Sequence, residues 1–277
     1  MTRIARIVRA AAVPRLPARR ADAHKGTFGT VLVLAGSDGM LGAAILCARG
    51  ALRGGAGLVR AALPRHLMAP FTVAVPAATT LPRPAAARLP PALGGASAIV
   101  AGPGLGATAA VRALVQALLR AATVPVVLDA DALNVLAPLR APLPGRAPKL
   151  LLPHPGEAAR LLGCDAAAVQ RDRAAAVQQL AARSGALAVL KGHGTLVCDG
   201  RRLFANRTGN PGMATGGTGD VLAGLIGALL AQGLQPFDAA CLAVHVHGKA
   251  GDLVARRLSP AGLCAEDLPL AIAEVLR

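Results

Sequence analysis

The sequence predicts a single α/β domain with a mostly parallel sheet flanked by helices. Short apolar runs alternate with segments whose apolar residues recur at helical spacing, which is the pattern of successive strand–helix–strand units. Of the 277 residues, 54% are hydrophobic, enough for a large buried core. The chain has no Trp or Tyr and only four Phe, so we expect an aliphatic core built by close helix packing.

The expected elements follow one another in a regular order. Buried strands are expected at short apolar runs that are followed by glycine, proline or a polar residue, at 30–35, 58–63, 97–101, 124–128, 149–152 and 186–190. Helices are expected at 41–52 and after Gly106, where Val111, Leu114, Val115, Leu118 and Leu119 repeat at helical spacing. A hairpin of 195–198 and 202–206, and then three helical segments, complete the series.

The domain is expected to run over 23–277, behind a basic arm of residues 1–22. Up to residue 21 the arm contains six arginines and no acid, and we expect residues 1–20 to be dispensable for fold and activity. A mitochondrial transit peptide is the minority alternative, because serine enrichment is missing and two prolines interrupt any helix. The proline-rich stretches 76–91 and 138–148 are interpreted as loops inside the domain, because strands on both sides belong to one series.

Charge and cysteine content exclude several classes of protein. The net charge of +16 could indicate an acidic partner, but arginine-rich coding bias explains most of it, and almost no aromatics are present to bind nucleic acid. Five cysteines without a C-x-x-C pair indicate reduced, buried thiols in a cytoplasmic protein, not disulfides or a zinc site. No apolar stretch is long enough to span a membrane.

The most informative stretch is 206–220, which reads NRTGNPGMATGGTGD. It leads directly into an apolar run of helical spacing, so Gly216, Gly217, Thr218 and Gly219 lie where a loop becomes a helix. Free N–H groups and the positive end of a helix make such a turn an anion site. Asp220 stands beside that anion, and a carboxylate there is best explained as a base that takes a proton from an attacking hydroxyl.

Five further motifs follow expected strands, in the order GSDGMLGA, GPGLG, DADALN, PHPGE and KGHGT. Because the carboxyl ends of parallel strands meet at one edge of a sheet, these motifs predict a shared cleft. Asp129 and Asp131 could bind a cation or cap the helix containing Asn134, and the two readings have equal weight. His245 and His247 do not share a helical face, so we interpret them as packing residues and not metal ligands.

The motifs together resemble one family. GGTGD at a helix start is similar to the anion hole and catalytic base of ribokinase-like kinases. Its combination with HKGTFG at 24–29, PHPGE, KGHGT and NRTGNPGM resembles the ADP/ATP-dependent NAD(P)H-hydrate dehydratases of that superfamily. The resemblance runs from about His24 to Pro269. It implies a ribokinase-like three-layer sandwich and a carbon–oxygen lyase.

The resemblance also implies an activity and roles for particular residues. The family restores the S epimer of hydrated NADH or NADPH by phosphorylating the 6-hydroxyl with ADP or ATP and then eliminating phosphate. Asp220 would be the base, with Mg²⁺ bridging the phosphates. The hydrated substrate would contact Ala43, Gly104, His154 and Asp220. The nucleotide would contact Lys191, Gly192, His193, Gly194, Thr195, Gly216, Gly217, Thr218 and Gly219. Glu157 would support the metal indirectly.

Two alternatives and two expectations about partners complete the predictions. A ribokinase-like kinase of hydroxymethylpyrimidine or hydroxyethylthiazole would use the same Asp220, although HKGTFG and NRTGNPGM favour the dehydratase. A catalytically inactive nucleotide-binding protein is disfavoured by the intact Asp220. The resemblance implies a homo-oligomer, with a tetramer favoured. We also expect the chain to lack the family's epimerase domain and to depend functionally on an NAD(P)H-hydrate epimerase.

Overall fold

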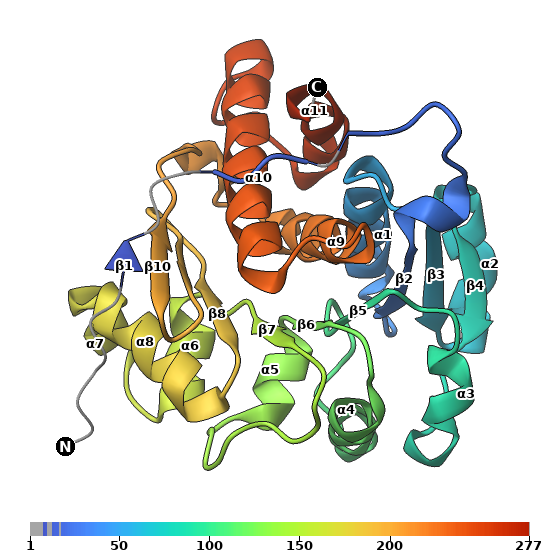
Figure 1. Cartoon of the computed structure of the whole chain (residues 1–277), viewed down its shortest axis with the longest axis horizontal. Coiled ribbons are helices and arrows are strands. Elements are labelled where there is room, and N and C mark those ends of the chain that lie inside the picture. The colour runs from blue at the N-terminus through green and yellow to red at the C-terminus, as the bar shows by residue number, and fades with distance from the viewer. Residues whose placement is uncertain (1–7, 10–12, 17, 277) are drawn as a thin grey trace.

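The centre of the protein is a sheet to which ten strands of the described residues contribute (Figure 1). The computed structural model describes residues 8–9, 13–16 and 18–276. The strands are β1 (Val8–Arg9), β2 (Thr30–Leu34), β3 (Leu58–Leu63), β4 (Thr79–Pro82), β5 (Ala98–Ala101), β6 (Val126–Leu128), β7 (Lys149–Leu151), β8 (Leu187–Leu190), β9 (Leu196–Cys198) and β10 (Arg202–Ala205). Their order is β1-β10-β9-β8-β7-β6-β5-β2-β3-β4, and only the pairs made by β9 are antiparallel.

Helices cover both faces of this sheet, which gives three layers (Figure 1). One face packs against α1 (Leu41–Arg53), α2 (Arg65–Ala74), α9 (Thr218–Ala231), α10 (Pro236–Leu258) and α11 (Leu268–Val275). The other packs against α3 (Leu89–Leu93), α4 (Ala109–Ala121), α5 (Asp131–Leu136), α6 (Pro155–Leu162), α7 (Ala166–Arg171) and α8 (Arg173–Ser184). Along β2, Val31 and Val33 enter the first core and Leu32 and Leu34 the second, because successive strand side chains alternate between faces.

Close helix packing in the first core depends on glycine, as the aliphatic composition predicted. The helices α1 and α9 approach so closely that a side chain at Gly224 would overlap the Cys47 carbonyl, and one at Gly50 would overlap the Val221 carbonyl. Helix α9 is buried along most of its length. This contact fixes the start of α9, and with it the GGTGD loop, relative to the sheet.

The expected strands and the hairpin are confirmed, with boundaries that differ by at most two residues. The prediction that 76–91 is a loop is wrong, because this stretch contains β4 and α3. Strand β4 lies at the edge of the sheet, beside β3, and none of its four residues is fully buried, so its sequence lacks the apolar signature of the inner strands. Helices α2, α7 and α8 were not predicted, whereas 138–148 is a loop as expected.

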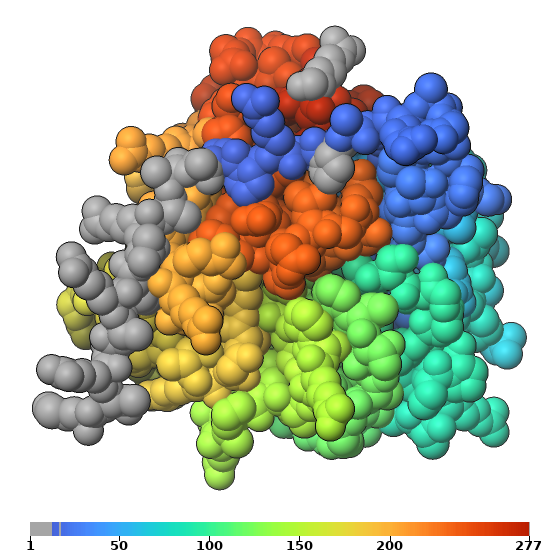
Figure 2. Space-filling model, viewed as in Figure 1, coloured from blue at the N-terminus to red at the C-terminus, as the bar shows by residue number. Residues whose placement is uncertain are grey.

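The described part of the basic arm packs on the domain. Val13 and Leu16 contact the first core, and the Arg19 guanidinium lies 3.9 Å from the centroid of the Phe28 ring. Arg19 also donates a hydrogen bond to the Gly55 carbonyl at 2.6 Å. Figure 2 shows this blue segment against the orange and red helices of the C-terminal part. This packing argues against the expected dispensability of residues 1–20, and the domain boundary at residue 22 stays a prediction.

The five cysteines are free, and three of them are buried. Cys164 and Cys264 are exposed, so the expectation of buried thiols is wrong for these two, which lie in loops next to helix ends. Within the part of the chain that the structure describes, none of the helices combines the length and the apolar character that crossing a membrane requires.

Candidate active site

The five motifs that follow strands lie along one edge of the sheet, as the sequence predicted. Strands β2, β5, β6, β7 and β8 are consecutive neighbours and run parallel, so their carboxyl ends point the same way. The loops after them contain GSDG, GPGLG, DAD, PHPGE and KGHGT, respectively. Polar groups from five loops are therefore available at one edge, which is where ligands bind in open α/β sheets.

The GGTGD loop turns into helix α9 at this edge. Gly217 is the residue before the helix and has φ +94°, and a side chain there would overlap Leu46 of α1. Only glycine tolerates both constraints. The Thr218 hydroxyl donates to the carbonyls of Met213 and Thr215, which closes the loop onto the helix start. The first N–H groups of α9 therefore lie at the N-terminal end of the helix, at the same edge of the sheet as the five loops. The helix dipole favours an anion at that end.

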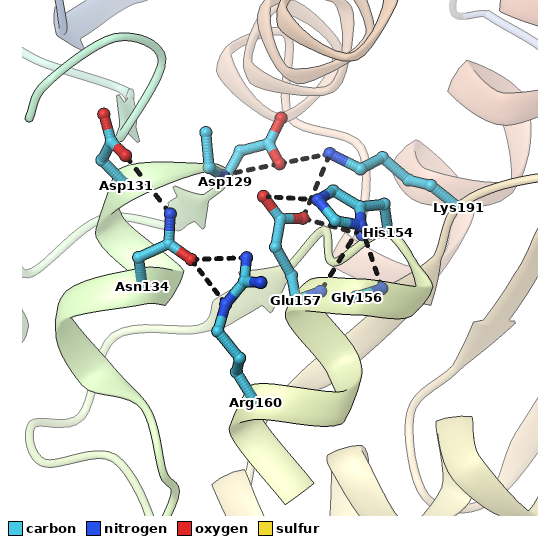
Figure 3. Close-up of polar contacts among 9 residues, drawn as sticks. Asp129, Asp131, Asn134, His154, Gly156, Glu157, Arg160 and Lys191 are labelled. Carbon is cyan, nitrogen blue, oxygen red and sulfur yellow. Dashed lines mark hydrogen bonds and ion pairs between the residues drawn. The ribbon is translucent and has the colours of Figure 1, made fainter. Parts of the chain in front are cut away.

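Two carboxylates, Asp129 and Glu157, surround Lys191 in a buried cluster behind this loop (Figure 3), and Asp220 is a third carboxylate close enough for their charges to act on it. Lys191 Nζ lies 2.5 Å from Asp129 Oδ1 and 3.9 Å from Glu157 Oε2, and both carboxylates are buried. Burial opposes the charge of Lys191, but Asp129 and Glu157 outweigh it and raise its pKa. A side chain atom added at Gly219 would lie 3.2 Å from Lys191 Nζ, so the ammonium is next to the anion loop.

Asp220, the third carboxylate, is poised near neutral pH. Burial, and then the neighbouring Asp129 carboxylate, raise the pKa of Asp220 to about 7, although Lys191 opposes the rise. Burial likewise raises the pKa of Asp129 to about 6. A general base works best when its pKa lies close to the operating pH, because it is then both ionised and able to hold the proton. Asp220 meets that condition.

The backbone around Asp129 is unusual. Ala130 has φ +46° and ψ −117°, a conformation that residues with a side chain rarely adopt, and its N–H donates to Asp129 Oδ1 at 2.9 Å. A side chain at Gly102 would overlap the Asp129 carbonyl, so the loops after β5 and β6 are in close contact. Strained backbone is concentrated at functional sites, and this strained residue directly follows the carboxylate that pairs with Lys191.

His154 and Glu157 form a reciprocal cap at the start of α6 (Figure 3). The N–H groups of Gly156 and Glu157 donate to His154 Nδ1 at 3.0 and 3.4 Å, and the His154 N–H donates to Glu157 Oε2 at 2.8 Å. Because Nδ1 accepts hydrogen bonds, the proton of the neutral ring is on Nε2. Nε2 lies 3.5 Å from Glu157 Oε1, and because the side chain is half exposed, Nε2 also has access to solvent.

Asp131 ties loops and helices together, and because no side chain caps the start of α5, the capping reading of the DADALN motif is wrong, whereas the cation reading stays a prediction. Its carboxylate accepts from the Gly106 N–H at 2.8 Å and from Asn134 Nδ2 at 3.2 Å, and Asn134 in turn accepts from Arg160 (Figure 3). These bonds tie the loop after β5 to helices α5 and α6. Among the described residues, no group of three or more His, Cys, Asp or Glu side chains is arranged to hold a metal.

Ala43 and Gly104 lie side by side at the GSDG end of the edge. Gly104 has φ +57°, and a side chain there would come within 3.1 Å of Ala43 Cβ and 2.7 Å of the Met40 carbonyl. The Ser37 hydroxyl donates to the Gly104 carbonyl at 2.9 Å. The two loops therefore form one surface, next to the anion loop through the packing of α1 against α9.

The KGHGT loop lines a cavity of about 370 Å³ on the other side of the anion loop. All five predicted residues, Lys191 to Thr195, contribute to its wall. Thr218 and Gly219 close one end, and residues of the 206–214 segment and of α10 supply the rest. The structure thus brings the predicted nucleotide-binding residues Lys191–Thr195, Thr218 and Gly219 into one wall, whereas Gly216 and Gly217 do not line this cavity.

The NRTGNPGM segment is seated on α10, a feature that the sequence reading missed. Asp252 of α10 accepts from the Gly209 N–H at 3.0 Å and from Asn210 Nδ2 at 3.1 Å. Side chains at Gly248 and Gly251 would overlap Thr208 and Met213, respectively. In the sequence, this contact could have been indicated only by the spacing of Gly248, Gly251 and Asp252 on one helix, which is a weak signal.

His247 is buried in α10, as the packing interpretation predicted, but it also lines the cavity. Its Nε2 lies 2.9 Å from the Thr218 carbonyl, and burial lowers the pKa of His247 to about 4. The ring is therefore neutral at physiological pH. His245, by contrast, is partly exposed and does not line the cavity.

This arrangement agrees with the comparison against protein families. A family model described as NAD(P)H-hydrate dehydratase matches residues 31–273. The chain belongs to the NAD(P)H-hydrate dehydratase family. The ribokinase-like fold class and the family resemblance are thereby confirmed, whereas the roles of individual dehydratase residues stay predictions.

Relatives and solved structures agree with this membership. The chain is 44% identical over 276 residues to a bifunctional NAD(P)H-hydrate repair enzyme of Moorella thermoacetica, covering 95% of this chain and 52% of that protein. It is 45% identical to the ADP-dependent (S)-NAD(P)H-hydrate dehydratase of Neisseria meningitidis, covering 91% of this chain and 86% of that one. The chain thus spans about half the length of the bifunctional relatives.

Among solved structures, the ADP/ATP-dependent NAD(P)H-hydrate dehydratase of Bacillus subtilis, co-crystallised with ATP and Mg²⁺, superimposes with a TM-score of 0.85 at 36% identity. The match covers 94% of this chain and 93% of that one. A hydroxyethylthiazole kinase from Pyrococcus horikoshii has a TM-score of 0.59 at 17% identity, which shows a shared fold only.

Proposed function

We propose that this protein dehydrates the S epimer of hydrated NADH or NADPH, using ADP or ATP as phosphoryl donor. The observation that carries the proposal is the position of Asp220. It lies in the first turn of α9, directly after Gly219 of the cavity wall, at the junction of the anion loop with the buried charges of Asp129, Lys191 and Glu157. A base at that junction can act on a hydroxyl that approaches from one side while the phosphate approaches from the other.

The reaction follows from this arrangement. Asp220 takes the proton of the 6-hydroxyl, and the oxygen attacks the terminal phosphorus of the nucleotide, so that AMP leaves from ADP or ADP leaves from ATP. The N–H groups of the Gly216–Gly219 loop hold the phosphoryl group while its charge is transferred. The phosphorylated hydrate then loses phosphate from C6 and a proton from C5, which restores the double bond of the nicotinamide ring.

His154 is proposed to hold the hydrated ring in place. Its Nδ1 is occupied by the N–H groups at the start of α6, so the neutral ring donates only through Nε2, which a substrate oxygen would share with Glu157 Oε1 at 3.5 Å. A hydroxyl or carboxamide oxygen of the substrate could accept from it. Because the cap fixes the ring, this donor is preorganised, which lowers the entropy lost on binding.

The residues present fit a magnesium ion that is held chiefly by the nucleotide. Mg²⁺ usually binds through one or two carboxylates, substrate phosphates and several waters. The described residues form no cage of three ligands, and Asp129 and Glu157 both lie close to Lys191, so Glu157 would only order the ion's water shell and not bind the ion directly. When bound, the ion would neutralise charge on the phosphates. We further propose a cytoplasmic homo-oligomer that works with an NAD(P)H-hydrate epimerase.

The test is a repair assay with purified protein. Hydrated NADH, Mg²⁺ and ADP or ATP are supplied, and the absorbance of reduced nicotinamide is followed together with release of AMP or ADP and phosphate. We expect absorbance to return with one phosphate released per ring restored. A kinase of vitamin precursors would consume nucleotide with such precursors and leave hydrated NADH unchanged, and that result would contradict the proposal.

A further inference from the structure

His247 presents an unpaired lone pair to the nucleotide cavity. The Thr218 carbonyl can only accept a hydrogen bond, so His247 Nε2, at 2.9 Å from it, must donate. The pKa lowered by burial keeps the ring neutral, and a neutral imidazole has one proton. Nδ1 is therefore a fixed acceptor.

That acceptor belongs to a residue of the cavity wall. No hydrogen bond among the described residues involves Nδ1, yet no described side-chain nitrogen or oxygen is both buried and without a partner. Nδ1 must therefore have some exposed surface. The residue as a whole is 8% exposed, and it lines the cavity together with Val244 and Gly248 of the same helix. A ligand in this cavity must supply a donor, because leaving a mostly buried acceptor unpaired weakens binding.

The position of the ring selects which donor. Thr218 and Gly219 are the anion loop, so the phosphates of a bound nucleotide lie beside the carbonyl to which His247 donates. Nδ1 belongs to the same ring as the Nε2 that donates to this carbonyl, so a ligand group that reaches Nδ1 is also close to the phosphates. A phosphate oxygen is excluded, because it would bring an acceptor against an acceptor. The amino group of adenine is at the far end of the nucleoside, whereas the ribose hydroxyls are next to the phosphates.

We propose that His247 accepts a hydrogen bond through Nδ1 from a ribose hydroxyl of the bound ADP or ATP. This inference rests on the proposed nucleotide-dependent function, and it makes His247 a specificity-determining residue that distinguishes ribonucleotides from deoxyribonucleotides. The same ring anchors the anion loop through Nε2. The sugar and the phosphates are thereby aligned by one side chain.

The experiment measures the affinity of the full-length protein for ADP, 2′-deoxy-ADP, 3′-deoxy-ADP and IDP by calorimetry with Mg²⁺. A neutral hydrogen bond corresponds to a change of about 3- to 10-fold. We expect one deoxy analogue to bind that much more weakly than ADP in the wild type. His247→Leu should abolish this difference, and His247→Phe provides a second variant without a lone pair in case the first does not fold.

The matched control is His245→Leu, which removes an imidazole from the same helix outside the cavity and should keep the wild-type preference for ADP. The inference is overturned if both deoxy analogues bind the wild type as tightly as ADP does. It is also overturned if the preference for ADP over a deoxy analogue survives in His247→Leu. Weakened binding of IDP alone would transfer the contact to the base and equally overturn it. If the wild-type protein does not bind ADP at all, the proposed function itself is contradicted. If only the ribose contact is wrong, the wild-type protein still binds ADP.

Discussion

Replacing Asp220 by asparagine is expected to stabilise the ligand-free protein, with a gain that increases as the pH rises. The carboxylate of Asp220 lies in a partly buried site close to Asp129, and its pKa is raised to about 7 from an ordinary value of 3.8. The folded protein therefore retains a proton that the unfolded chain releases near pH 4. Asparagine has nearly the same shape and no charge, so it removes this penalty.

The sign and size of the effect follow from proton linkage. Where the folded state binds more protons than the unfolded state, the free energy of unfolding falls as the pH rises. For Asp220 this window runs from about pH 4 to about pH 7. A shift of about three pKa units corresponds to ~4 kcal/mol, and solvent screening at a partly exposed group reduces the gain expected for asparagine to about 1–3 kcal/mol.

The assay is thermal and urea unfolding of both proteins without nucleotide, at pH values from 4 to 8. For a chain of this size, each kcal/mol shifts the melting temperature by roughly 2–4 °C. Glu266→Gln is the matched control, because it removes one carboxylate from an exposed position and should leave stability nearly unchanged. A stability difference between wild type and Asp220→Asn that stays constant over this pH range would refute the reasoning.

Three further predictions concern His154, Asp252 and Arg19. His154→Asn keeps an oxygen to cap α6 but lacks the imidazole donor, so use of hydrated NADH should weaken while ADP affinity stays the same; equal loss of both would indicate a structural role. Asp252→Ala should weaken ADP binding several-fold by releasing the segment that it holds, and unchanged calorimetric affinity would contradict this. Arg19→Ala should lower the free energy of unfolding by about 1 kcal/mol in urea titrations, whereas the same change at exposed Arg20 should have little effect.

The inner sheet could be predicted from the sequence because its physical signal is local. Buried parallel strands need continuous apolar runs, and each predicted run is followed by a glycine, a proline or a polar residue. Edge strand β4 gave no such signal, because its half-exposed side chains are not under the same constraint. The packing of Val13 and Arg19 on the domain could not be predicted either, because the residues that they contact lie far away in the sequence.

The candidate site divides in a similar way. The GGTGD loop and the five edge motifs are local in sequence, and their convergence follows from parallel strand order alone. The contacts that hold the NRTGNPGM segment are not local: Asp252 reaches back to Gly209, and Gly248 makes room for Thr208. The lone pair of His247 depends on a carbonyl in a different helix, so no pattern within α10 could reveal it.

The central claim is that Asp220, beside the anion loop, takes the proton of the attacking hydroxyl, and single-turnover kinetics of Asp220→Asn tests it most directly. Enzyme in excess is mixed with hydrated NADH and ADP, and recovery of reduced nicotinamide is followed, with folding checked by circular dichroism and ADP affinity by calorimetry. A general base typically contributes about 10²- to 10⁴-fold in rate. We predict a loss of at least ~100-fold with the fold intact and ADP affinity equal to or slightly above that of the wild type. A folded variant with near-normal turnover would contradict the account.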